Sequence, residues 1–192
     1  MQMEELEPGS TALVLGSRRD RRAFCLRHLA KAERSAAVVL PADPLGTAKD
    51  YNQLGGEAPL TVVLEGGEQA DEGPIVASDV HAVDVNARSL PAVGEATVET
   101  LESGGTNPPA DRLWLAGLPR LLERVSVQQI YRLLYILSKH VRQVDGIGLY
   151  ALDASIDRKT ARILRQPLDY EVTLASESDP EIWALAGQSA DV

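Results

Sequence analysis

Short apolar runs alternate with helical patterns along most of this chain. The runs are rich in Val, Leu, Ile and Ala and almost continuous, which is typical of parallel strands buried on both faces. They lie at 11–15, 35–40, 60–64, 112–116 and 147–152. Weaker strand signals lie at 75–77 and 80–85, and the alternating run at 168–174 predicts a last strand.

Helical periodicity occupies the segments between these runs. It predicts helices at 20–32, 46–54, 90–101, 126–144 and 156–165. The strongest is 126–144, where apolar residues recur at helical spacing and Ser126 with Gln129 forms a capping box. Gly146 is expected to end this helix in a left-handed conformation. The alternation of strands and helices predicts an α/β fold, a three-layer sandwich with a mostly parallel sheet flanked by helices.

The length of 192 residues fits one domain with a sizeable core. We assign this domain to 11–175, with 1–10 as a flexible lead-in and 176–192 as a polar tail. Within the tail, Trp183 lies in a short apolar segment that we expect to form one amphipathic turn, docking on the domain or on another protein.

Charge and composition narrow the classes of function. A net charge of −9 argues against nucleic-acid binding and against docking on anionic lipid. The single Cys25 excludes an internal disulfide, and its apolar neighbours predict a buried core thiol. No apolar run reaches the ~20 residues of a membrane span, and the acidic start does not resemble a signal peptide, so we expect a cytoplasmic protein.

The segment LVLGSRRDRRAFCL, at 13–26, has the order of a phosphate-binding loop: an apolar strand, a glycine and then a helix. The motif GxxxxGK[ST] requires a second Gly, a Lys and a Ser or Thr. The chain has Arg21, Arg22 and Ala23 at those positions.

Three stretches then carry a family resemblance: TALVLGS, RLWLAGLPRLLERVSVQQIYRLLYILSKHVR and IGLYALDASIDRKTARILRQPLDYEV. In order and hydrophobic pattern the chain resembles the RecA and KaiC-like P-loop ATPase superfamily over 11–175. It is most similar to small RecA-like proteins of haloarchaea with degenerate Walker motifs. Only four of its 19 basic residues are Lys, and this Lys-poor, acidic composition fits adaptation to high salt or a GC-rich genome.

The resemblance implies a pseudo-ATPase. In active members the Lys neutralises phosphates and the hydroxyl holds magnesium, and both residues are replaced here. The acidic residue at the end of the Walker B strand falls on Ala116. Asp43 is the nearest counterpart of the catalytic carboxylate, but its PADP context favours a turn-forming role. We therefore expect no catalytic residue, no bound metal and no cofactor.

Two sets of binding residues remain as candidates. The first lies at the start of the predicted helix at 20–32 and consists of Gly16, Ser17, Arg18, Arg19, Arg21 and Arg22. These residues form either an anion- or partner-binding site or a run of charges exposed to solvent. The second is a partner interface at Tyr131, Tyr135 and Trp183. Alternatively, the predicted helix at 126–144 is apolar on two sides because it is central to the domain. Our first hypothesis is a regulatory or scaffolding domain that acts through protein partners or as a homo-oligomer. The alternative is a nucleotide- or anion-binding switch that uses the arginine-rich loop.

Overall fold

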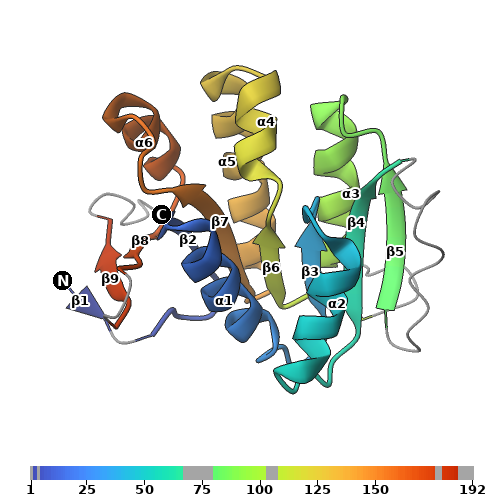
Figure 1. Cartoon of the computed structure of the whole chain (residues 1–192). Coiled ribbons are helices and arrows are strands. Elements are labelled where there is room, and N and C mark those ends of the chain that lie inside the picture. The colour runs from blue at the N-terminus through green and yellow to red at the C-terminus, as the bar shows by residue number, and fades with distance from the viewer. Residues whose placement is uncertain (1, 4, 67–79, 103–107, 176–178, 186–192) are drawn as a thin grey trace.

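The computed structural model describes residues 2–3, 5–66, 80–102, 108–175 and 179–185 (Figure 1). Its strands are β1 (Gln2–Met3), β2 (Ser10–Gly16), β3 (Ala36–Val39), β4 (Leu60–Glu65), β5 (Val80–Val85), β6 (Arg112–Leu115), β7 (Ile147–Asp153), β8 (Tyr170–Thr173) and β9 (Glu181–Ala184). Its helices are α1 (Arg18–Leu29), α2 (Pro44–Gln53), α3 (Leu90–Glu102), α4 (Leu118–Arg124), α5 (Val127–Gln143) and α6 (Arg158–Arg165).

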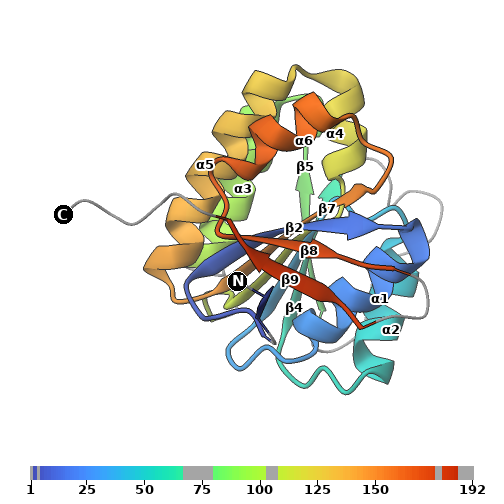
Figure 2. The same ribbon diagram turned by 90° about the vertical axis from the view of Figure 1, so that its left-hand side faces the viewer.

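The described strands form one sheet in the order β1-β9-β8-β2-β7-β6-β3-β4-β5. All neighbours from β8 to β5 pair in parallel, and β9 pairs antiparallel with β8 and with β1. Helices α1 and α2 cover one face, and α3, α5 and α6 cover the other (Figures 1 and 2). The predicted α/β sandwich with a mostly parallel sheet is confirmed.

Each face of the sheet has its own apolar core. Along β2, Leu13 and Leu15 join the core beneath α3 and α5, while Ala12 and Val14 join the core beneath α1 and α2, because successive strand side chains point to opposite faces. Cys25 lies in the second core and is fully buried, and burial raises the pKa of its thiol. The prediction of a buried core thiol is confirmed.

Helix α4 was missed by the sequence analysis, which predicted no helix between the strand at 112–116 and the helix at 126–144. In the structure Gly117 is the N-cap and Pro119 lies in the first helical turn, a position that proline tolerates because its missing N–H has no intrahelical partner there. Leu118 and Leu121 are buried in the core beneath α5. Helix α4 has only seven residues, so its apolar residues, three positions apart, form too short a pattern to predict a helix from the sequence.

The end of α5 also differs from the expectation. The left-handed residue is Asp145, with φ of 50°, and not Gly146. The Gly146 N–H donates to the Val141 carbonyl at 2.9 Å. A Cβ on Gly146 would lie 3.2 Å from the Asp111 carbonyl oxygen, so glycine is favoured at this position by close packing.

The described parts of both terminal segments contribute to the sheet, which the sequence analysis did not expect. Gln2–Met3 forms β1, Leu6 is buried and Ser10 begins β2, so these residues of the lead-in assigned to 1–10 belong to the fold. Trp183 lies in β9, and the predicted amphipathic turn is wrong because this segment pairs with β8. The strand predicted at 75–77 and the tail residues 176–178 and 186–192 lie outside the described residues.

His28 provides a pH-dependent contribution to stability. Burial, followed by the nearby Lys31, Arg112 and Arg27, lowers the pKa of His28 from 6.5 to about 4. Its ring packs on Phe24 with the ring centroids 4.4 Å apart. Because the folded protein binds this proton more weakly than the unfolded chain, stability is fully present above pH 6.5 and is lost as the pH falls towards 4.

We therefore expect the free energy of unfolding of the wild type to fall more steeply than that of His28→Gln between about pH 6.5 and pH 4, by up to about 3 kcal/mol in total. Urea unfolding of both proteins at several pH values measures the difference. Parallel curves for the two proteins would contradict the lowered pKa of His28.

Candidate functional site

The carboxyl edge of the parallel sheet is the first place to look for a site, because ligands of open α/β sheets bind beyond these strand ends. Gly16 ends β2 and pairs in register with Asp153 at the end of β7. Strand β6 ends nearby at Leu115, followed by Ala116 and Gly117. Gly16 and Ala116 therefore lie along this edge, and Arg21, Arg22 and Ala23 lie within the helix α1 that follows Gly16.

The connection from β2 to α1 is a tight turn. Only Ser17 separates the strand from the helix, which begins at Arg18. Ser17 caps the helix: its Oγ accepts from the Asp20 N–H at 3.2 Å and donates to the Asp20 carboxylate at 2.6 Å. The positions that correspond to the rest of a phosphate loop are thus helical, and the side chain of Asp20 already supplies negative charge at the helix start.

Gly16 is buried against the segment that follows β8. A Cβ at this position would lie 2.8 Å from the Cβ of Leu174 and 3.3 Å from its carbonyl oxygen. The Leu174 N–H also donates to the Leu15 carbonyl at 2.8 Å. The close approach of Leu174 is therefore enough to require glycine at position 16, without any phosphate.

The structure separates the four arginines that the sequence brings together. Arg18 and Arg19 are exposed, whereas Arg21 is 9% exposed. Arg22 reaches across to α2, where it donates to Thr47 Oγ1 at 3.0 Å and to the Asp50 carboxylate at 2.8 Å. The charge in the position of the catalytic Lys is thus engaged with a neighbouring helix.

Arg21 has the most unusual environment of the four. Its Nη1 is buried and has no hydrogen-bond partner. Burial lowers the pKa of the guanidinium, and the negative charge of Asp153 partly offsets this effect. Asp153 itself is exposed and accepts from the N–H and the hydroxyl of Ser155, which lower the pKa of its carboxyl group.

A groove of about 570 Å³ lies between α1 and α2. Its wall carries three arginines, one acid and several apolar groups, from Arg19, Arg22, Ala23, Leu26, Arg27, Asp50, Gln53 and Leu54. Arg19 and Arg22 therefore share a surface with Arg27, a residue that the sequence analysis did not include. Arg19 and Arg22 lie three residues apart, which places them on one face of α1, but Arg27 lies five residues after Arg22, a spacing that does not indicate a shared helix face.

At the ends of β3 and β6 the edge is closed by packing. Leu40 follows β3 with φ of 53° and is 3% exposed. A Cβ on Gly117 would lie 2.4 Å from the Leu40 Cβ. Arg120 of α4 donates to the Leu40 carbonyl at 2.7 Å and to the Pro41 carbonyl at 3.4 Å. These contacts occupy the strand ends beside Ala116, and no short sequence pattern marks them.

Asp43 has the turn-forming role that its sequence context favours. It is the N-cap of α2, and its carboxylate accepts from the Gly46 N–H at 2.9 Å. Its carbonyl accepts from the Thr47 hydroxyl at 2.6 Å. The carboxylate thus satisfies an otherwise unpaired helix donor.

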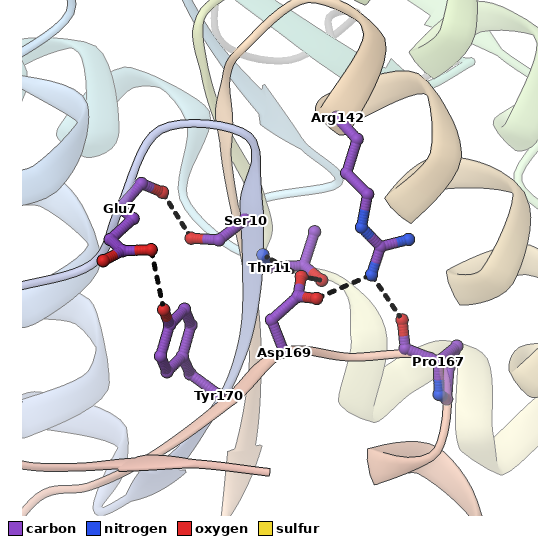
Figure 3. Close-up of polar contacts among 7 residues, drawn as sticks. All are labelled: Glu7, Ser10, Thr11, Arg142, Pro167, Asp169 and Tyr170. Carbon is purple, nitrogen blue, oxygen red and sulfur yellow. Dashed lines mark hydrogen bonds and ion pairs between the residues drawn. The ribbon is translucent and has the colours of Figure 1, made fainter. Parts of the chain in front are cut away.

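A polar network lies at the opposite, amino edge of the sheet (Figure 3). Asp169 accepts from the N–H and hydroxyl of Thr11 at 2.9 and 3.0 Å, and from Arg142 at 2.8 Å. Tyr170 donates to Glu7 at 3.3 Å in the same view. This network ties α5 and β8 to the start of β2, and Arg142 and Asp169 are paired with each other, so it stabilises the fold.

The predicted interface residues lie on two different elements. Tyr131 and Tyr135 stack on α5 with ring centroids 6.5 Å apart; Tyr131 is half-buried and Tyr135 is 43% exposed. Trp183 lies on β9 near the sheet edge and is also 43% exposed. Helix α5 packs on β2 and β7 and also contacts α3, α4 and α6, so it is central to its helical layer, and it leaves Tyr135 and Ile136 exposed on its outer side.

Among the described residues, no group of three or more His, Cys, Asp or Glu side chains is placed to hold a metal ion. No described helix is both long enough and apolar enough to cross a membrane.

Comparison with solved structures identifies the fold. The chain is similar to a protein of Pyrococcus horikoshii OT3 studied as PH0250, with a TM-score of 0.58, 14% identity, and coverage of 95% of this chain and 90% of that one. It is also similar to the KaiC-like protein PH0186 of the same archaeon, with a TM-score of 0.54, 14% identity, and coverage of 95% and 81%. The fold is therefore RecA/KaiC-like, as the sequence resemblance implied.

Comparison of the sequence with protein-family models identifies the family of this chain. A family model described as a family of unknown function, DUF7504, matches residues 9–174, and the chain belongs to this family. No curated protein matches the sequence.

Proposed function

We propose that this protein is a non-catalytic RecA/KaiC-like domain, a regulatory or scaffolding protein that acts through protein–protein contacts. The observation that carries the proposal is the packed carboxyl edge of the sheet. There α1 begins directly after Ser17, Leu174 covers Gly16, and Leu40 packs against Gly117. Ser17, Leu174 and Leu40 are thus engaged in holding the fold together at the expected nucleotide site.

The chemistry of phosphoryl transfer supports the same proposal. Transfer depends on positioning the phosphates and neutralising their charge, usually with Lys, a metal-binding hydroxyl and an acid. Here Arg22 is paired with Asp50 on α2, and positions 23 and 116 carry alanine. The similarity to haloarchaeal RecA-like proteins and the degeneration of the Walker motifs are part of this proposal and stay predictions from the sequence.

The arginine-lined groove between α1 and α2 favours a second candidate, a nucleotide- or anion-binding switch without efficient hydrolysis. Arg19 and Arg27 line this groove, and only one acid, Asp50, lies among its wall residues. An isolated guanidinium fork binds phosphate or carboxylate groups well. In this candidate the anion would lie on the outer surface of α1 and not at the sheet edge.

An assay of purified protein with ATP and magnesium tests the first proposal. We expect no turnover above the background, and no difference between the wild type, Arg22→Ala and the control Arg162→Ala at an exposed position of α6. Turnover that Arg22→Ala abolishes and Arg162→Ala retains would overturn the proposal, because it would place Arg22 at a working phosphate site.

Calorimetric titration with ATP, GTP and a cyclic dinucleotide separates the two candidates. The non-catalytic proposal expects no heat of binding. Binding that weakens about tenfold or more in Arg19→Ala or Arg27→Ala, but not in Arg162→Ala, would favour the anion switch.

A further inference from the structure

An apolar groove of about 460 Å³ lies between α3 and α5, on the side of the sheet opposite to α1. Leu90, Pro91 and Val98 line it from α3, and Leu133 and Ile136 line it from α5. Ile136 is 47% exposed, and Tyr135 beside it is 43% exposed. We call this surface, formed by the outward sides of these two helices, the α3–α5 face. Contiguous exposed apolar groups of this kind mark interaction surfaces.

The charges on the two helices are opposite and segregated. Helix α3 contains Glu95, Glu99 and Glu102 and no basic residue, and all three are exposed. Helix α5 contains no acidic residue, although the chain has 28 of them, and exposes Arg132 and Lys139. The α3–α5 face therefore has an acidic half, with Glu95 at the apolar groove, and a basic half, with Arg132 at the groove, whereas Glu102 already contacts His140 of α5 in the same copy at 2.7 Å.

We infer that the α3–α5 face binds a second copy of this chain and forms a two-fold symmetric dimer. In such a dimer each surface must complement itself. A two-fold axis that runs parallel to the helices places α3 of one copy on α5 of the other, so acidic and basic halves meet. An axis across the helices would place α3 on α3 and oppose like charges.

The positions of Glu95 and Arg132 along their helices, here called their height, fit the two-fold axis that runs parallel to the helices. Glu95 and Arg132 both line the groove, and both lie in the first half of their helix. A rotation about an axis parallel to the helices preserves this height, so Glu95 of each copy faces Arg132 of the other. Ile136 of each copy then lies over the apolar groove and is removed from water.

The size of the face sets the strength of the dimer. Helices of 13 and 17 residues span about 20 and 25 Å, and two of them side by side cover on the order of 500 Å² per copy in projection. This is at the small end of specific interfaces, so the dimer should be reversible at micromolar concentrations. The inference goes beyond the proposed function, since the dimer would form whether or not the chain binds a nucleotide.

Sedimentation equilibrium from about 1 μM to about 1 mM, at about 0.15 M salt, tests the inference. We expect the average mass of the wild type to rise with concentration from 20.7 kDa towards twice this value. Ile136→Arg should weaken the dimer about tenfold or more. Leu54→Arg is the matched control, because Leu54 is also 47% exposed but lies beside α2 on the other face. A wild type that stays monomeric, or a dimer that responds to Leu54→Arg and not to Ile136→Arg, would overturn the inference.

A charge exchange tests the axis itself. Glu95→Arg and Arg132→Glu should each remain monomeric alone, because each opposes like charges across the axis. The double variant that carries both changes should dimerise again, as should an equimolar mixture of the two single variants. Thermal melts of every variant show whether it is folded. Failure of both the double variant and the mixture to dimerise, with all the proteins folded, would rule out the proposed arrangement.

Discussion

Replacing Gly117 by alanine is expected to lower the free energy of unfolding by about 3 kcal/mol. The new Cβ would lie 2.4 Å from the Leu40 Cβ and 3.0 Å from the Leu40 carbonyl oxygen. Leu40 cannot easily move away. It is 3% exposed, its N–H donates to the Val63 carbonyl at 2.8 Å, and its own carbonyl accepts from Arg120.

Gly94→Ala is the matched control for this prediction. Its Cβ would lie 3.2 Å from Leu133 Cδ1, which is the end of a flexible side chain. Alanine also favours the helix by about 1 kcal/mol over glycine, so we expect a net change within about 1 kcal/mol. Urea unfolding of the three proteins measures both effects. A loss in Gly117→Ala no greater than in Gly94→Ala would show that the contact with Leu40 is easily relaxed.

The second large effect is expected at Asp111, which is 6% exposed. Its carboxylate accepts from three consecutive backbone N–H groups, of Glu33 at 3.0 Å and of Arg34 and Ser35 at 3.2 Å. Asp111→Ala removes both carboxylate oxygens and with them all three hydrogen bonds, and it leaves the buried Ser35 N–H without its partner. We expect a loss of about 3 kcal/mol, because hydrogen bonds to charged groups and unpaired buried donors each account for about 1–3 kcal/mol.

Asp111→Asn separates the charge from the shape in this cluster. The amide keeps one oxygen acceptor, so the loss should be smaller than in Asp111→Ala, by about 1 kcal/mol or more. Hydrogen exchange of the Glu33, Arg34 and Ser35 amides gives an independent reading, with faster exchange expected in both variants. Unchanged exchange in Asp111→Ala would contradict the role of this carboxylate.

The fold could be predicted largely from local pattern. Buried parallel strands produce continuous apolar runs, so β2, β3, β4, β6 and β7 were recognised within one or two residues. The capping box at Ser126 also located the start of α5 correctly. Elements that depend on a distant partner were not recognised: β9 is a strand because β8 pairs with it, and its short apolar segment alone resembled a helical turn.

The candidate site was predictable in position but not in arrangement. The sequence analysis grouped the four arginines as one site because they are neighbours along the chain. Helix α1 then distributes them around its axis, which directs Arg22 to Asp50 on α2 and buries Arg21 near Asp153. The partners on α2 and β7 are tens of residues away or more, so no local spacing could indicate them.

The sequence alone determined where the apolar runs lie along the chain, the type of most elements and the residues at each position of the phosphate-loop comparison. These features depend on side-chain periodicity and on identity, which are local properties. Only the tertiary structure decided why Gly16 and Gly117 must be glycine, through Leu174 and Leu40, and which helix faces stay exposed. The α3–α5 face likewise exists only in the folded chain, because the parallel sheet brings an acidic and a basic helix side by side.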